Sequence, residues 1–274
     1  MNIKILFEDK NILAIDKPAG IVVHPDGKSK IIHPGKKTKE VKINTISDWV
    51  LLNYPSLKNV GEPIELKINN EELKIKRPGI VHRLDKETSG VLLIAKNQKT
   101  FLFLKEQFQN HKIKKVYRAF VYGFVSDPKA SLATNKRGVI NVPIGRSQKD
   151  IRAYTAGRGA REPLRESITE YIVLDRFMDE KNCKDNNKTE HQYSYIEAYP
   201  KTGRTHQIRV HMRYINHPVV SDPLYRGEKE LALGMKRLAL HSLSITFMLP
   251  DGKIKTVESP LPFDFKKVIK TYLA

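Results

Sequence analysis

Short blocks of apolar and polar residues alternate along the chain and predict many strands with few helices. Five apolar residues in a row at 91–95 indicate a buried strand, and Ser89-Gly90 before them indicates a tight turn. A short apolar piece at 21–23 is also expected to be a strand. Further strands are predicted at 3–7, 11–15, 116–123, 168–177, 191–199, 238–249 and 253–257.

Helical spacing of apolar residues is confined to four segments. We expect helices at 45–54, 100–110, 205–217 and 262–272. Thr45 and Asp48 have the spacing of a capping box, which predicts the start of the first helix. Arg209 and Arg213 are four residues apart, so we expect them to share one face of the third helix.

The segments between these elements are polar, and none of them divides the chain. We read loops at 26–44 and 178–190, loops and short strands at 126–165, and a loop with a hairpin at 56–77. No internal repeat or linker interrupts the pattern. We therefore expect a single catalytic domain over residues 1–274, with lysine-rich insertions near 26–44 and 56–77.

Length and composition fit a soluble globular protein. The 274 residues are 40% hydrophobic, and the longest apolar runs are too short for a membrane helix. The first residues lack a secretory apolar region, so we expect a cytoplasmic protein. The one cysteine, Cys183, excludes a disulfide framework and a cysteine zinc site, and its polar neighbours indicate a loop rather than a catalytic thiol.

The net charge of +19 indicates a specific kind of partner. A domain this basic usually binds a polyanion, most often nucleic acid. The alternative is a lysine-rich composition without a specific partner, and the lysines are indeed spread evenly. The arginines are less evenly spread, with Arg204, Arg209 and Arg213 close together. The guanidinium of arginine can donate two hydrogen bonds to one phosphate, which favours the nucleic-acid interpretation.

Asp85 is the most prominent candidate for chemistry. It lies in a polar loop just upstream of the strand at 91–95, beside Arg83 and Lys86. A rigid strand can hold such a carboxylate in one geometry, and cationic neighbours keep it ionised, as a nucleophile or general base requires. The same polar string is also typical of an ordinary hairpin loop, and composition alone favours that reading.

Two other clusters lie beside predicted elements. Lys115 precedes Tyr117 on a strand, where the tyrosine could equally be a packed strand residue, and Arg204, His206 and Arg209 lie together at the third helix. We find no metal set: His206 and His211 are five apart, which does not place both on one helical face. A kinase glycine-rich loop, a Gly-x-Ser-x-Gly elbow and a dinucleotide fingerprint are absent.

At these residues the chain resembles the RluA-type RNA pseudouridine synthases. The order and spacing of the matching strings agree over roughly residues 8–265, and the two longest strings are very specific. The strings are Asp16–Gly20 with His24-Pro25, His82–Val91, Lys115–Ala119, Thr202–His211 and Arg237–His241.

The resemblance implies an α+β fold, with a mixed, largely antiparallel sheet and flanking helices around a basic cleft. It implies an enzyme that isomerises uridine to pseudouridine in RNA, with rRNA the first candidate and tRNA the second, and with no cofactor. The partner is then RNA and not a membrane, and a monomer is expected. A non-catalytic RNA-binding protein and a glycosidase that releases free uracil are the alternatives.

The resemblance also assigns roles to residues. Asp85 is expected to act at the ribose, by adding to C1′ or by way of a glycal, with Arg209 as its ion-pair partner. Tyr117 is expected to lie against the base and take the C5 proton, and Arg83 to hold the target nucleotide out of its stack. The remaining residues expected to bind RNA are His82, Lys115, Arg204, His206, Gln207 and Ile208.

Two departures from the family pattern stand out. Ser221 stands where the family commonly has glycine, which puts the local backbone geometry in question. Many relatives carry an S4-like RNA-binding domain before the catalytic one, whereas here the catalytic pattern starts at the first residues. We therefore expect no such domain, and RNA capture by the catalytic domain's own basic surface.

Overall fold

The computed structural model describes residues 1–24, 45–68, 71–75, 77–126, 138–179 and 191–274, with 64–68 and 71–75 described by their backbone. The predicted loop at 26–44 and most of 178–190, including Cys183, lie outside the described residues. Two compact units are present: Met1–Ile113 with Thr246–Ser259, and Lys114–Ile245 with Pro260–Ala274. That the whole chain acts as one catalytic domain stays a prediction.

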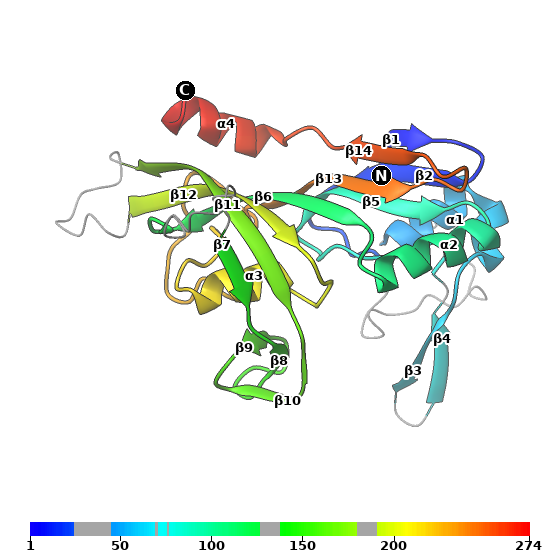
Figure 1. The fold of residues 1–274 in the computed structure, drawn as a ribbon, viewed down its shortest axis with the longest axis horizontal. Coiled ribbons are helices and arrows are strands. Elements are labelled where there is room, and N and C mark those ends of the chain that lie inside the picture. The colour runs from blue at the N-terminus through cyan, green and yellow to red at the C-terminus, as the bar shows by residue number, and fades with distance from the viewer. Residues whose placement is uncertain (25–44, 69–70, 76, 127–137, 180–190) are drawn as a thin grey trace, which may run out of the picture. The chain divides into compact units, whose positions relative to one another are not determined.

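The first unit is built on a buried pair of antiparallel strands. Strands β2 and β5 pair over six positions, from Ile12 opposite Ala95 to Lys17 opposite Gly90, and β1 pairs with the other edge of β2 (Figure 1). Its elements are β1 (Lys4–Glu8), β2 (Ile12–Lys17), α1 (Ile46–Asn53), the 3-10 helix η1 (Pro55–Asn59), β3 (Ile64–Ile68), β4 (Glu71–Ile75), β5 (Ser89–Ala95), α2 (Gln98–Gln109) and β14 (Ile254–Glu258). The predicted hairpin within 56–77 is confirmed as the β3–β4 pair.

Both helices of this unit start at side-chain caps. At α1 the Asp48 N–H donates to Thr45 Oγ1 at 3.1 Å, and the Thr45 N–H donates to Asp48 Oδ2 at 2.9 Å. This confirms the predicted capping box. At α2 the Thr100 N–H donates to Asn97 Oδ1 at 2.9 Å, so the helix begins two residues before its predicted start.

Two local predictions in this unit are wrong. Residues 21–23 form no strand: the carbonyls of Val22 and Val23 instead accept the first N–H groups of α1, from Ile46 at 3.0 Å and Ser47 at 2.9 Å. The turn expected at Ser89-Gly90 lies earlier, because β5 already begins at Ser89. The turn closes where the Thr88 N–H donates to the Asp85 carbonyl at 3.2 Å.

The second unit contains a twisted antiparallel sheet with a helix on each side. In it β6, β12, β11 and β7 pair in that order, and the predicted strands at 168–177 and 191–199 are confirmed as β11 and β12. Figure 1 shows α4 and α3 on opposite sides of these strands. Its elements are β6 (Lys114–Tyr122), β7 (Gly138–Asn141), β8 (Ile144–Ser147), β9 (Tyr154–Ala156), β10 (Ala160–Arg165), β11 (Ile168–Met178), β12 (Gln192–Pro200), α3 (Gln207–Tyr214) and α4 (Phe263–Tyr272).

Aromatic packing fixes one face of this sheet. The ring of Phe120 stacks on Tyr195 with centroids 4.8 Å apart and lies 5.1 Å from Phe265 of α4. Side chains alternate along a strand, so Phe120 and Arg118 face α4 while Tyr117 faces the other side. The remaining strand, β13 (Leu240–Met248), has residues in both units and pairs with β14.

The fold is α+β, as predicted, and the strand pairs named above are all antiparallel. Helix α3 begins at Gln207, two residues later than expected, because His206 before it adopts a left-handed φ of 57°. It ends at Tyr214 rather than just before Pro218. None of the described helices is both long and apolar enough to cross a membrane.

The capping box predicts a measurable loss of stability. Thr45→Ala removes the oxygen that accepts the Asp48 N–H, and we expect the free energy of unfolding to fall by about 1 kcal/mol in urea titrations. Thr45→Ser keeps that oxygen and should unfold close to the wild-type midpoint. Equal midpoints for Thr45→Ala and the wild type would show that the cap contributes nothing.

Candidate active site

The first unit positions Asp85 in a loop that hydrogen bonds hold at its main chain. The loop runs from Ile80 to β5, and Leu84, only 4% exposed, anchors it in the core. The carbonyl of Asp85 accepts the Thr88 N–H, and the next carbonyl, that of Lys86, accepts the Gly20 N–H at 2.9 Å. Asp85 itself is half-buried. Hydrogen bonds therefore hold the main chain of this loop in place, and Asp85 is partly exposed.

A buried lysine lies against this loop. Lys17, the last residue of β2, is 0% exposed, and its Nζ donates to the carbonyls of Pro18 at 2.8 Å, Ile21 at 2.8 Å and Lys86 at 3.0 Å. Lys17 lies in one of the family strings but had no predicted role. A lysine that ends an apolar strand and precedes a proline was the only available signal.

His82 connects the same loop to the sheet. Its Nε2 accepts the N–H of Leu93 in β5 at 2.9 Å, and its ring stacks on Phe108 of α2 with centroids 4.7 Å apart. A backbone N–H can only donate, so the proton of this imidazole is on Nδ1. These contacts give His82 a structural role, whereas Arg83 beside it is exposed. RNA contacts by either residue stay predictions.

The second unit contains a buried ion pair at Arg209. Nε and Nη2 of Arg209 donate to the two carboxylate oxygens of Asp222 at 2.8 and 2.9 Å, with side chains 7% and 0% exposed. Asp222 Oδ1 also accepts the N–H groups of Leu224 at 2.9 Å and Tyr225 at 3.1 Å. The Tyr225 ring lies 4.9 Å from the guanidinium carbon. Asp222 had no predicted role, and the pairing of Arg209 with Asp85 stays a prediction.

Ser221, immediately before Asp222, retains a backbone geometry that glycine normally adopts. Its φ is 56°, in the left-handed region, although the residue carries a side chain. The side chain is buried, and its Oγ donates to the Met235 carbonyl at 2.8 Å. This hydrogen bond offsets part of the strain, so the departure from glycine leaves a defined turn.

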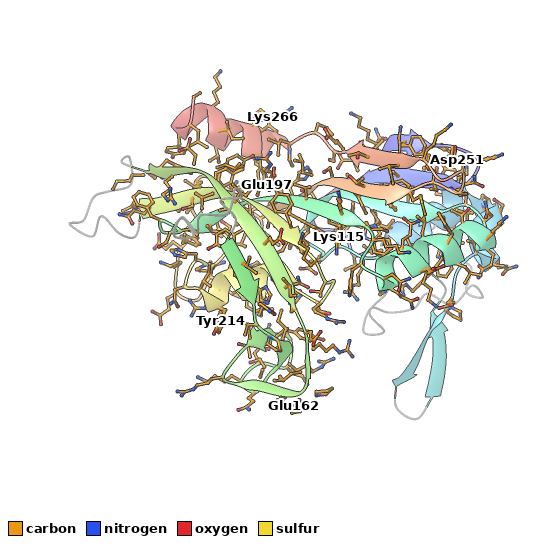
Figure 2. All side chains as sticks on the ribbon, viewed as in Figure 1. Lys115, Glu162, Glu197, Tyr214, Asp251 and Lys266 are labelled. Carbon is orange, nitrogen blue, oxygen red and sulfur yellow. The ribbon has the colours of Figure 1, made fainter. Side chains whose placement is uncertain are left out.

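Lys115 and Tyr117 lie on one face of β6, because they are two residues apart on a strand. Lys115, labelled in Figure 2, donates from Nζ to the Thr202 carbonyl at 2.9 Å. Its ammonium lies deep enough that loss of hydration lowers its pKa from 10.5 to about 8. Tyr117 is half-buried and packs against the hydrophobic core of this unit.

Both ends of the Gln207 side-chain amide form hydrogen bonds within the protein. Its amide nitrogen donates to the Ile168 carbonyl and to Thr169 Oγ1, at 2.9 and 3.0 Å. Its amide oxygen accepts from Thr202 Oγ1 at 2.7 Å and from the Arg204 N–H at 2.9 Å. The adjacent Ile208 is 5% exposed and belongs to the core. Their predicted contact with RNA stays untested, and the observed contacts fix the start of α3.

The basic residues at the start of α3 and within it differ in exposure. Arg204 is half-buried and donates from Nε to the Glu166 carbonyl at 2.9 Å. His206 Nδ1 lies 2.8 Å from the Tyr225 hydroxyl. Arg213 is exposed whereas Arg209 is buried, so the two do not share an environment although they are four residues apart. Arg204, His206 and Arg209 are nevertheless brought together around the start of α3.

No group of three metal-binding side chains occurs among the described residues. The first unit thus presents a carboxylate on a tied loop, and the second presents guanidiniums, a phenol and a desolvated ammonium. Such a set can stabilise a cationic sugar and hold phosphates. Side chains of these types are those with which enzymes and binding proteins contact nucleic acids.

Comparison with known proteins identifies the family. The family model described as RNA pseudouridylate synthase matches residues 11–214, and the chain belongs to this family. This confirms the resemblance found from the sequence. The chain is 32% identical over 271 residues to a Bacillus subtilis protein named uncharacterized RNA pseudouridine synthase YlyB, covering 98% of this chain and 73% of that protein.

Two further relatives carry a more specific name. The ribosomal large subunit pseudouridine synthase D of Borreliella burgdorferi is 34% identical, over 96% of this chain and 66% of that protein. The protein of the same name from Neisseria meningitidis serogroup B is 32% identical, over 96% of this chain and 59% of that protein. The chain therefore spans 59–66% of the length of these two relatives.

Solved structures agree on the fold. The human RNA pseudouridylate synthase domain containing 1 aligns with a TM-score of 0.64 at 22% identity, covering 96% of this chain and 84% of that one. The human RNA pseudouridylate synthase domain containing 4 gives the same score and identity, covering 97% and 91%.

The buried ion pair predicts a large loss of stability. Asp222→Ala leaves the buried Arg209 guanidinium without this carboxylate, and we expect the free energy of unfolding to fall by about 3–5 kcal/mol in urea titrations. Asp150→Ala, at the exposed pair with Arg152 in the same unit, is the matched control and should change the midpoint far less. Equal losses at the two sites would contradict a special contribution of the buried pair.

Lys115 predicts a pH dependence of stability. Its pKa in the folded state, about 8, lies below the ordinary 10.5, so the unfolded state binds more protons between these values. Stability should therefore rise with pH in this window. From pH about 7 to about 9.5 we expect the wild type to gain about 1–2 kcal/mol relative to Lys115→Met. Lys114→Met, at the exposed neighbour, should follow the wild type. Parallel curves for wild type and Lys115→Met would refute the lowered pKa.

Proposed function

We propose that this chain isomerises a uridine of ribosomal RNA to pseudouridine, with Asp85 as the catalytic carboxylate. The observation that carries the proposal is membership of the RNA pseudouridylate synthase family across residues 11–214, with Asp85 held in a tied, half-buried loop. The names of the Borreliella and Neisseria relatives favour rRNA, and tRNA is the second candidate substrate.

The reaction breaks the bond from uracil N1 to ribose C1′ and forms a bond from C5 to the same C1′. The proton on C5 is lost and N1 gains one, so the product is an isomer of the substrate. Cleavage of an N-glycosidic bond develops positive charge on the sugar, which a carboxylate at its face stabilises. Asp85 does this either by adding to C1′ or by assisting a glycal intermediate. No cofactor is required in this scheme.

Arg209 and Tyr117 complete the proposed centre. The pair with Asp222 uses Nε and Nη2 of Arg209 and fixes the guanidinium plane, so the group can serve as a rigid partner for the Asp85 carboxylate. Tyr117 lies against the uracil and takes the C5 proton after the base has turned. These roles follow from the family resemblance, and the fixed side chains of the second unit are compatible with them.

RNA binding is proposed to rest on charge and on extrusion of the target nucleotide. The base must turn within the site, so the nucleotide has to leave its stack. In this proposal Arg83, which is exposed, holds it there. The other proposed RNA ligands are His82, Lys115, Arg204, His206, Gln207 and Ile208. With a net charge of +19, binding should weaken steeply as salt rises. A basic cleft, a monomeric state and a cytoplasmic location belong to the same proposal.

Loss of pseudouridine in cells tests the proposal and names the substrate. Total rRNA and tRNA from cells that lack the protein are treated with carbodiimide and mapped by primer extension. We expect at least one pseudouridine stop to disappear and to return with the wild type but not with Asp85→Asn, since the amide cannot stabilise the developing charge. Glu106→Gln, at an exposed carboxylate of α2, is the matched control and should restore the stop.

Binding of the mapped RNA by Asp85→Asn separates catalysis from capture. We expect affinity close to that of the wild type, because the substitution removes no positive charge. Restoration of the stop by Asp85→Asn would show that the carboxylate is not needed and would leave a different catalytic residue or a binding role.

A further inference from the structure

We propose that Arg77 and Arg83 together bind one phosphate group of the RNA backbone beside the target uridine. The proposal rests on the proposed function, since it takes RNA as the substrate. It assigns a role to Arg77, a residue outside the proposed catalytic and RNA-binding sets.

The main chain at Arg77 is held firmly in the first unit. Its carbonyl accepts the Ile80 N–H at 3.2 Å, which closes a turn. Within this turn the Gly79 N–H donates to the Val60 carbonyl at 2.9 Å, and the Gly79 carbonyl accepts the Ala95 N–H at 2.8 Å. A Cβ at Gly79 would lie 2.1 Å from the Ala95 carbonyl oxygen, so the turn packs directly against the end of β5. The Arg77 side chain therefore leaves the main chain at a fixed point.

The segment that leads from Arg77 to Arg83 runs along β5. Ile80 forms a bridge with Ile94, and the His82 imidazole accepts an N–H group of the same strand. Arg83 follows directly after His82 and is exposed. Both guanidiniums thus come from one short segment whose main chain is attached to the sheet.

The guanidinium of Arg77 is poorly compensated for its depth. Its Nε is buried and forms no hydrogen bond with any described residue. Burial lowers the pKa of Arg77, the charge of Arg83 lowers it further, and the charge of Glu62 raises it. Both carboxylate oxygens of Glu62, however, already accept from Lys105 Nζ, at 2.6 and 2.7 Å. Arg77 is therefore a half-buried cation that lies near a second cation.

A phosphate of the RNA would supply the missing negative charge. Guanidiniums donate paired hydrogen bonds to phosphate oxygens, and such charge-assisted bonds are strong. In the proposed function Arg83 holds the target nucleotide, so a phosphate bound by both arginines belongs to that nucleotide or to its neighbour. Phosphate contacts fix the position of a protein on its nucleic acid. We therefore expect Arg77 to act on RNA binding.

Binding by Arg77→Met tests the proposal with a transcript of ribosomal RNA. We expect the Kd to rise about 10-fold and the slope of log affinity against log salt to fall by about 1, because one phosphate contact is lost. In kinetic assays the loss should appear in KM rather than in kcat. Lys99→Met, which removes an exposed charge of the same unit, is the matched control and should change the Kd far less.

Stability separates RNA binding from a structural role. Arg77→Met removes a buried nitrogen without a hydrogen bond and a charge that Arg83 repels. We expect its urea midpoint without RNA to equal or exceed that of the wild type. Wild-type affinity for RNA, or a clearly lower midpoint, would overturn the proposal, because Arg77 would then serve the fold.

Ethylation interference identifies the group that Arg77 contacts. Ethylation neutralises single phosphates at random along the transcript, and the molecules that the protein still binds show which phosphates it needs. We expect one phosphate, at or beside the target uridine, to be needed by the wild type but no longer by Arg77→Met or Arg83→Met. The same needed phosphates in the wild type and Arg77→Met would contradict the contact.

The double variant shows whether the two arginines share their phosphate. Because residues with a common partner are coupled, the losses of affinity in Arg77→Met and Arg83→Met should not simply multiply when combined. Losses that multiply would assign the arginines to separate phosphates and overturn the proposal. A wild type that needs this phosphate for binding but forms no pseudouridine would refute the proposed function alone.

Discussion

The antiparallel pairing of β2 with β5 is the constraint on which the candidate active site depends. Residues Ile12–Ile15 and Val91–Ala95 are completely buried, so the register of the pair is fixed by the core. Once the register is fixed, the loop after β2 and the loop before β5 must leave at the same end. Asp85 lies in the second of these loops, and its placement follows from the core beneath it.

Buried polar groups then fix the segments that bear the proposed catalytic residues. Lys17 in the first unit, and Arg209 with Asp222 in the second, are among the most deeply buried charges of the described residues. An apolar core would avoid the cost of removing their hydration. Each such group fixes a segment that bears a proposed catalytic residue: Lys17 the loop of Asp85, and Asp222 the guanidinium of Arg209. Their hydrogen bonds therefore hold these segments in one geometry.

Local signals predicted much of the fold. The capping box at Thr45 and the strands at 91–95, 238–249 and 253–257 depend on neighbouring residues, and all of them are present. The wrong prediction at 21–23 concerns residues whose structure depends on partners far away in the sequence. Residues 21–23 look like a strand, but their carbonyls meet the N-terminus of α1, which lies beyond the residues at 25–44.

The proposed catalytic residues could be predicted from the sequence, but the residues that hold them in place could not. Family strings identified Asp85, Tyr117 and Arg209, whereas nothing in the sequence shows that Asp222 accepts both Nε and Nη2 of Arg209. The contact of Lys17 with Lys86, 69 residues away, is equally invisible to any local pattern. Such partners are set by tertiary packing, which spacing along the chain does not encode.

Release of the C5 proton is the most direct test of the central claim, because formation of a bond from C5 to C1′ requires its loss. The purified protein is incubated with ribosomal RNA transcribed with uridine tritiated at C5. We predict that tritium appears in water while all uracil stays attached to the RNA. Retention of the tritium on the RNA, or release of free tritiated uracil, would contradict an RNA pseudouridine synthase.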